Sequence, residues 1–328
     1  MMGPIGHKIL IVMHRIACCV VVVFISEALL GSQESRAPQV AIPGVIAAGT
    51  PVDTVRGGFK GLEGPVAAPD GGLFFSDIPA NITYKLEPNG TINVWRENTG
   101  GANGLFLARD GRLLAVEGGG RRIVAVTPDK RVMPLATAFK GQPLRAPNDL
   151  IADSRGGIYF TDPAPRPTPD TAPKEPGNVH YLTPKGEVLL LDGQIRRPNG
   201  LTLSIDEKTL YVGDTEGEFV YAFDAGSDGR VSNKRQFARL LEPEKGSLGP
   251  RSRADGMAID AMGRLYVSTA AGIQVVDSRG AHLGIIRLPS VARNAAFGGK
   301  DRRTLYLTAL ESLYRVQMLA AGPAGRSK

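Results

Sequence analysis

The sequence predicts an all-β protein, a six-bladed β-propeller built from four-stranded antiparallel blades. Three observations support this prediction. One pattern of residues recurs six times along the chain, and short alternating strands follow each copy. Gly and Pro, at 41 and 24 of 328 residues, also make up about a fifth of the chain, against ~12% in ordinary usage. Many turns and few long helices are therefore expected.

Each repeat has three parts: a polar residue that opens a small or apolar stretch, a turn, and an apolar strand. The opening residues are Glu63, Asn103, Asn148, Asn199, Asp255 and Asn294. The apolar strands are residues 73–77, 113–117, 158–162, 210–214, 265–269 and 305–308. The openings lie roughly 40 to 56 residues apart, a period that fits one four-stranded blade. A generic all-β sandwich is the alternative, but it does not explain why both the turn and the polar residue recur.

Further strands complete the blades in chain order. The clearest pairs are 81–86 with 91–96, 122–126 with 131–135, and 179–182 with 187–191. The sixth repeat is short, because little chain remains after residues 313–316. We therefore expect its outer strand to come from residues 50–59, which would close the ring. The predicted propeller covers residues 46–318, after a linker over 33–45 and before a disordered tail over 319–328.

Residues 1–32 have the pattern of a secretory signal peptide. Lys8 and Arg15 precede an apolar run over residues 16–25, and small and polar residues follow. The run is shorter than the ~20 residues that a spanning helix needs, so a permanent membrane anchor is the alternative. We expect a periplasmic or secreted protein with no stable membrane span after cleavage. Both cysteines, Cys18 and Cys19, lie in this segment, so the mature domain would carry no disulfide and no Cys-ligated metal.

The charges exclude one class of partner. Lys and Arg number 39 against 32 Asp and Glu, for a net charge of +7, but they are scattered along the chain. Nucleic-acid binding needs a clustered basic face, and no block of like charges is present in the sequence. We therefore expect a small-molecule partner and no nucleic acid.

The six opening residues are candidates for chemistry. In a propeller the innermost strands begin near one face of the central channel, so repeat-equivalent residues converge there. All six side chains here are carboxylates or carboxamides. Such hard oxygen ligands suit Ca²⁺, which takes about 6–8 of them, with Mg²⁺, Mn²⁺ or Zn²⁺ as alternatives. A single Asn or Asp before Gly can be simply a turn residue, but Glu63 has no such turn role.

Several stretches, in this order and spacing, resemble one known family. They are Glu63-Gly64-Pro65, Asn103-Gly104-Leu105, Pro147-Asn148-Asp149-Leu150, Tyr159-Phe160-Thr161-Asp162-Pro163, Pro198-Asn199-Gly200-Leu201 and Asp255-Gly256-Met257-Ala258-Ile259-Asp260. The chain is similar to the SMP-30/gluconolactonase/regucalcin-like (LRE-like) family of six-bladed propellers, over roughly residues 50–316.

The resemblance implies roles for single residues. One divalent metal would be held by Glu63, Asn199 and Asp255, with Asn148 completing the site or touching substrate. Asn103 and Glu117 would be substrate contacts. The sequence departs from the family at Gly118, where a His often follows the Glu, so one polar contact of the usual substrate is missing.

The resemblance implies metal-dependent hydrolysis of a sugar lactone or a related cyclic ester, with Asp255 as the general base. A Ser-His-Asp triad is not expected, because the sequence has no Gly-x-Ser-x-Gly elbow and only His180 and His282 lie beyond the signal. Two alternatives stay open. One is a non-catalytic exported propeller that binds a ligand or partner, and the other is an enzyme of the strictosidine-synthase-like branch.

Overall fold

The computed structural model describes residues 39–165, 175–326 and 328. The chain divides into two units, Met1–Ala37 and Pro38–Lys328, and all described residues belong to the second. The predicted signal peptide and residues 33–38 of the predicted linker lie outside the described residues. Every element of the described part is a strand, and none of it forms a helix with the length and apolarity that a membrane crossing needs.

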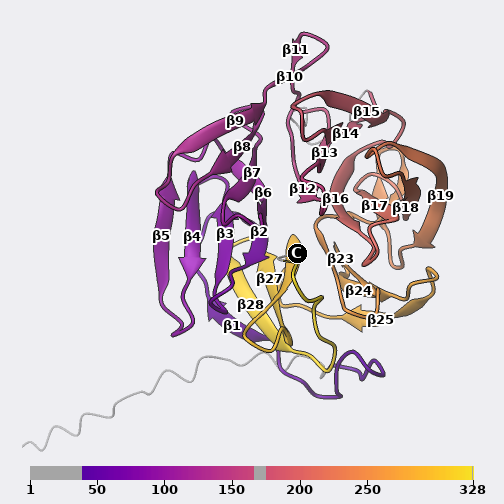
Figure 1. Cartoon of the computed structure of the whole chain (residues 1–328). Coiled ribbons are helices and arrows are strands. Elements are labelled where there is room, and N and C mark those ends of the chain that lie inside the picture. Colours follow the sequence, from indigo (N-terminus) through magenta and orange to yellow (C-terminus); the bar gives the residue numbers. More distant parts are fainter. Residues whose placement is uncertain (1–38, 166–174, 327) are drawn as a thin grey trace, which may run out of the picture. The chain divides into compact units, whose positions relative to one another are not determined.

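Six four-stranded antiparallel sheets form the blades of a β-propeller, which confirms the predicted fold class (Figure 1). The first blade contains β2 (Leu62–Ala67), β3 (Leu73–Asp77), β4 (Ile82–Leu86) and β5 (Ile92–Glu97). The second contains β6 (Ala102–Leu107), β7 (Leu113–Glu117), β8 (Arg122–Val126) and β9 (Val132–Ala136). The third contains β12 (Leu150–Ala152), β13 (Ile158–Asp162), β14 (Asn178–Leu182) and β15 (Val188–Asp192).

The fourth blade contains β16 (Pro198–Leu203), β17 (Thr209–Asp214), β18 (Phe219–Ala225) and β19 (Val231–Arg239). The fifth contains β22 (Met257–Ile259), β23 (Leu265–Thr269), β24 (Gly272–Val276) and β25 (His282–Ile286). The sixth contains β26 (Asn294–Gly298), β27 (Thr304–Ala309), β28 (Ser312–Gln317) and β1 (Asp53–Arg56). Two short hairpins extend from the ring: β10 (Ala138–Phe139) with β11 (Gln142–Pro143), and β20 (Glu244–Gly246) with β21 (Gly249–Arg251).

The ring closes as the sequence predicts, because the outer strand of the sixth blade is β1. It pairs antiparallel with β28, and Asp53 lies opposite Arg315 and Thr54 opposite Tyr314. Closure leaves no blade with an open inner face, so each blade packs between two neighbours. The apolar clusters lie between adjacent blades: Leu62 and Phe75 of the first blade, for example, pack with Ala296 of the sixth.

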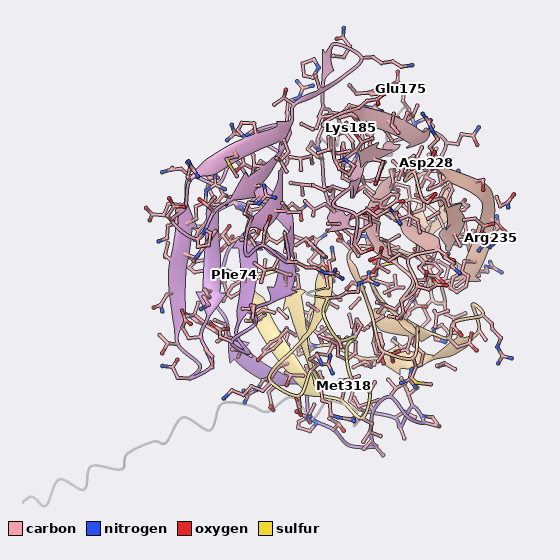
Figure 2. All side chains as sticks on the ribbon, in the orientation of Figure 1. Phe74, Glu175, Lys185, Asp228, Arg235 and Met318 are labelled. Carbon is pink, nitrogen blue, oxygen red and sulfur yellow. The ribbon has the colours of Figure 1, made fainter. Side chains whose placement is uncertain are left out.

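The outer strand is the least buried strand of each blade. All residues of β13 and β26 are buried, whereas β19 is mostly exposed. Asp228, in the turn before β19, and Arg235 on β19 lie at the outer edge of the fourth blade (Figure 2). The inner strands can be short and apolar because neighbouring blades cover both of their faces.

The recurring Asp-Gly turns join the first and second strands of several blades. Gly71 and Gly111 adopt φ of 92° and 83°, a left-handed backbone that glycine accepts at least cost. The preceding aspartates stabilise these turns, since Asp70 Oδ1 accepts a hydrogen bond from Gly72 N at 2.8 Å and Asp110 Oδ1 one from Arg112 N at 3.1 Å.

The two ends of the described unit differ from the expected linker and tail. Ile42 and Val45, placed in the predicted linker, are buried against the fifth and sixth blades. In the predicted disordered tail, Ala320 is buried, and Lys328 donates a hydrogen bond to Asp149 inside the ring. Apolar and small residues at both ends fill space that the blades leave open, so the packed unit extends beyond residues 46–318.

Candidate metal and active site

Five of the six opening residues line one cavity of about 370 Å³. They are Glu63, Asn103, Asn148, Asn199 and Asp255. Each lies at the start of the innermost strand of its blade, or just before it, so five different blades contribute one oxygen side chain each. The structure thus brings together every residue that the resemblance assigns to the metal, and also Asn103.

The glycine that follows most opening residues explains why the blades meet so closely here. A Cβ on Gly200 would lie 2.2 Å from the carbonyl oxygen of Asp255, and a Cβ on Gly64 would lie 2.0 Å from that of Asn103. The next blade's backbone therefore occupies the space that a side chain would need. The repeated polar-Gly pair combines a channel-facing side chain with a residue that lets the next blade approach.

Three carboxylates lie near one another in and below this cavity. Burial and the negative charges of Asp255 and Asp149 raise the pKa of Glu63 well above its ordinary value, while Arg293 and a hydrogen bond from Asn294 act in the opposite direction. Asn294 Nδ2 lies 3.3 Å from Glu63 Oε2. Like charges gathered in a buried site repel one another unless a cation lies among them.

The side chains around the cavity fit a hard divalent cation. Within the described ranges no group of three or more His, Cys, Asp or Glu side chains could hold a metal, so Glu63 and Asp255 must be supplemented by amide oxygens. Asn199 is oriented for this, because its Nδ2 donates to Thr215 Oγ1 at 3.1 Å, which leaves the amide oxygen without a partner among residues 39–165, 175–326 and 328. Thr215 Oγ1 is in turn fixed by Ala254 O at 2.7 Å.

Basic residues that the sequence analysis did not single out also line the cavity. They are Lys60, Arg197 and Arg293. Arg293 Nη1 lies 3.3 Å from Asp255 Oδ2, and buried Arg197 donates to Ala164 O at 2.8 Å. Arg197 and Arg293 stand two and one residues before an opening residue. Arg253 likewise stands two residues before Asp255, but it does not line the cavity.

Glu117, the expected substrate contact, does not line the cavity. Its side chain is fully buried and forms ion pairs with Arg96 at 2.8 Å and with Arg122 at 2.5 Å. Both carboxylate oxygens are therefore already engaged. Asn294, the sixth opening residue, also lies outside the cavity lining and contacts Glu63 instead.

The fold and the site define a six-bladed β-propeller with an oxygen-lined cavity at one end of its channel. The sequence profile of the SMP-30/Gluconolactonase/LRE-like region matches residues 62–311. The chain belongs to this family.

Characterised relatives agree with this assignment. The chain is 30% identical to a gluconolactonase of Zymomonas mobilis over 83% of each sequence. It is 31% identical to the pentonolactonase XacC of Haloferax volcanii, over 75% of this chain and 80% of that one. Among solved structures, a gluconolactonase of Xanthomonas campestris aligns with a TM-score of 0.75 at 28% identity, over 86% of this chain and 94% of that one.

Proposed function

We propose that this protein hydrolyses a sugar lactone or a related cyclic ester with the help of one divalent metal ion. The observation that carries the proposal is the convergence of Glu63, Asn148, Asn199 and Asp255 in one cavity. The relatives named gluconolactonase and pentonolactonase support the reaction, since fold alone would not define it.

Glu63, Asn148, Asn199 and Asp255 would hold the metal through their oxygens. Ca²⁺ is the ion we favour, because charged and neutral oxygen ligands together suit it. Human regucalcin is also among the relatives, at 29% identity over 72% of this chain and 78% of that one. A solved calcium-binding regucalcin of Agrobacterium tumefaciens shares the fold, with a TM-score of 0.71 at 16% identity over 84% of this chain and 96% of that one. When bound, such an ion polarises the lactone carbonyl and lowers the pKa of a water molecule.

The protein's own side chains divide the remaining work. Asp255 takes the proton of the attacking water as its oxygen bonds to the carbonyl carbon, and returns it to the ring oxygen as the ester bond breaks. Arg293 orients this carboxylate through its 3.3 Å contact. The amides of Asn103 and Asn148 line the same cavity and can donate hydrogen bonds to the oxyanion that develops on the carbonyl.

A panel of lactones, assayed with and without EDTA, tests the proposal. We expect turnover that EDTA abolishes and Ca²⁺ restores, and its loss in Asp255→Asn together with weakened Ca²⁺ binding. Full hydrolysis by the metal-free protein would overturn the metal-dependent mechanism. Tight Ca²⁺ binding without turnover of any lactone would instead support the non-catalytic binding propeller.

We also infer that the protein acts after export, to the periplasm or beyond it. The support is the pattern of residues 1–32, where Lys8 and Arg15 precede the apolar run 16–25. N-terminal sequencing of the protein from its native cells tests this inference. A mature chain that begins after residue 26 agrees with it, and a chain that retains Cys18 contradicts the cleaved signal.

A further inference from the structure

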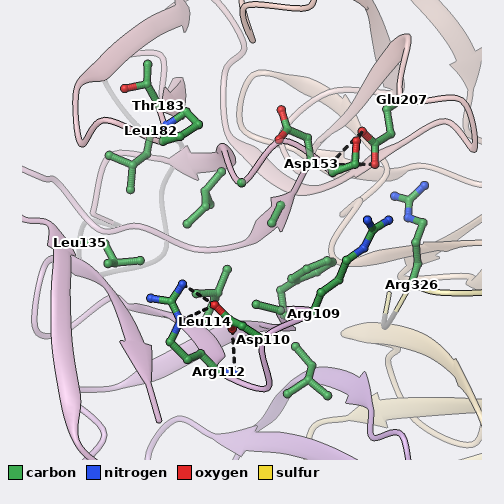
Figure 3. A pocket seen from close by; sticks show the side chains of 18 of the residues that line it. Arg109, Asp110, Arg112, Leu114, Leu135, Asp153, Leu182, Thr183, Glu207 and Arg326 are labelled. Carbon is green, nitrogen blue, oxygen red and sulfur yellow. Dashed lines mark hydrogen bonds and ion pairs between the residues drawn. The ribbon is translucent and has the colours of Figure 1, made fainter.

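A second cavity, of about 390 Å³, lies at the other end of the inner strands (Figure 3). Strand β6 shows the relation, because Asn103 near its start lines the metal cavity and Leu107 at its end lines the second one. The turns 108–112 and 183–186 contribute further walls. Arg326, near the end of the described chain, supplies another, and none of the proposed metal or substrate residues lies here.

One side of this second cavity is apolar. Its lining includes Phe106, Leu114, Leu135, Ile158 and Leu182. Four of these five side chains are buried, and Leu135 packs partly buried against the same core. Leu114, Leu135 and Leu182 lie together on one side of the cavity in Figure 3. A ligand here would therefore place hydrocarbon against this side.

The acidic groups of the second cavity already have partners. Asp110 Oδ2 pairs with Arg112 at 2.6 Å, and Asp153 Oδ2 pairs with Arg155 at 2.7 Å. Glu207 Oε2 accepts a hydrogen bond from Ser154 Oγ at 2.7 Å. These carboxylates therefore offer little free capacity to a ligand.

Two of the three arginines in the lining, Arg109 and Arg326, keep donors without a partner among the described residues, whereas Arg112 is paired with Asp110. Arg326 Nη1 donates to Leu203 O at 3.1 Å and to Ser204 O at 3.0 Å, but its buried Nη2 has no hydrogen-bond partner in the described part of the chain. Arg109 makes no hydrogen bond or ion pair with any described residue, and Figure 3 shows its guanidinium on the same side of the cavity as Arg326. The groups of this cavity that still lack hydrogen-bond partners are therefore N–H donors of positively charged side chains.

We propose that this second cavity binds an organic anion with an apolar body, of the type of a medium-chain carboxylate. The carboxylate would accept hydrogen bonds from Arg109 and Arg326, because a guanidinium matches a carboxylate in charge and geometry. The hydrocarbon chain would lie against the leucine side. A sugar acid released by lactone hydrolysis lacks this apolar body, so the inference does not depend on the proposed function.

Calorimetric titration of the full chain with octanoate tests the proposal, with octanol as the neutral probe of the same chain length and acetate as the anion without a tail. We expect octanoate to bind and both controls to bind at least about tenfold more weakly, because octanol lacks the charge that the arginines would pair with and acetate lacks the apolar tail. Arg109→Gln and Arg326→Gln should each weaken octanoate binding by about tenfold or more.

Arg131→Gln is the matched control, because Arg131 is an exposed arginine of the β8–β9 turn that does not line the cavity. It should leave octanoate binding unchanged. Arg109 is exposed and unpaired among the described residues, so its variant should fold, and a melting curve without ligand checks this. Absence of octanoate binding to the wild type, equal binding of octanol, or full affinity in Arg109→Gln would overturn the proposal.

Discussion

Glu63 is the residue whose ionisation should respond most to the metal. Burial and the charges of Asp255 and Asp149 raise its pKa above the ordinary 4.5. A buried carboxyl of this kind is most favourable when protonated, so the metal-free protein should lose stability as pH rises through the raised pKa. Glu63→Gln should remove this loss, and also the stabilisation that Ca²⁺ gives to the wild type.

Melting temperatures between pH 4 and pH 8, with and without Ca²⁺, would check this expectation. The metal-free wild type and Glu63→Gln should differ least below pH ~4.5 and most at neutral pH. Glu187→Gln, a change at an exposed carboxylate, serves as the control and should follow the wild type. A pH-independent difference between wild type and Glu63→Gln would count against a buried, repelled carboxylate.

Glu117 should affect stability and not substrate binding, because its carboxylate forms ion pairs with Arg96 and Arg122. Removing one partner of a buried charge network typically costs about 3–5 kcal/mol. Glu117→Gln should therefore lower the free energy of unfolding by about 3 kcal/mol, at the lower end because Arg122 is partly exposed. Denaturant unfolding measures this, and KM for the best lactone should not change. A raised KM with unchanged stability would restore Glu117 as a substrate contact.

Among the strands, the close approach of neighbouring blades predicts an effect of one methyl group. The Cβ of Gly200→Ala would meet the carbonyl oxygen of Asp255 at 2.2 Å, so strand β16 or Asp255 must move. We expect Ca²⁺ affinity to fall by about tenfold or more, as for other changes that disturb ligand orientation. Gly193→Ala is the control, since its Cβ would meet only ordinary contacts. Isothermal titration with Ca²⁺ distinguishes them, and equal affinities would contradict the argument.

His180 on β14 predicts a pH dependence of stability that is separate from the metal site. It is fully buried between the rings of Phe139 and Phe160, and burial lowers its pKa to about 4. The unfolded chain binds a proton near pH 6.5, whereas the folded protein does not until about pH 4. Stability should therefore fall as pH drops from 6.5 to 4, by about 3 kcal/mol in all.

Denaturant unfolding of wild type and His180→Gln across this range measures the His180 contribution. The difference between the two proteins is the relevant quantity, because nearby Asp162, whose pKa burial raises, titrates in both. The gap between them should narrow as pH falls. A constant gap would mean that His180 is protonated in the folded protein.

The blades could be predicted from the sequence because each one repeats the same turn and opening residue. Glu63, Asn199 and Asp255 could be predicted as site residues for the same reason, since repeat-equivalent positions occupy equivalent places in the ring. Arg293 and Arg197 could not be predicted in this way, because their proximity to the cavity depends on tertiary packing. Arg253 has the same spacing to its opening residue as Arg197, yet it does not line the cavity. Glu117 illustrates a further limit: a buried carboxylate looks the same in sequence whether it contacts a substrate or an arginine.

At the scale of the whole molecule, one ion pair joins the end of the described chain to the interior of the ring. Lys328 and Asp149 are both buried and paired with each other. Asp149 holds the position where the other blades have Gly64, Gly104, Gly200, Gly256 and Ala295. Lys328→Met would leave the buried carboxylate of Asp149 without its cationic partner, so we expect the free energy of unfolding to fall by about 3–5 kcal/mol.

Adding Asp149→Asn to Lys328→Met should recover much of that loss, because the unpaired charge is then gone. Denaturant unfolding of the two single variants and the double variant completes the cycle. Strictly additive losses in the double variant would show that the pair does not couple the tail to the channel.

Closure of the sixth blade by β1 also has a consequence for how the chain is made. Strand β1 leaves the ribosome before any blade is complete, yet its partner β28 emerges only after the other five blades have been synthesised. Until β26 and β27 follow, the first blade exposes the apolar face that Ala296 and Tyr306 later cover. Translation products that stop before residue 294, where β26 begins, should therefore be prone to aggregation, because their ring remains open at that face.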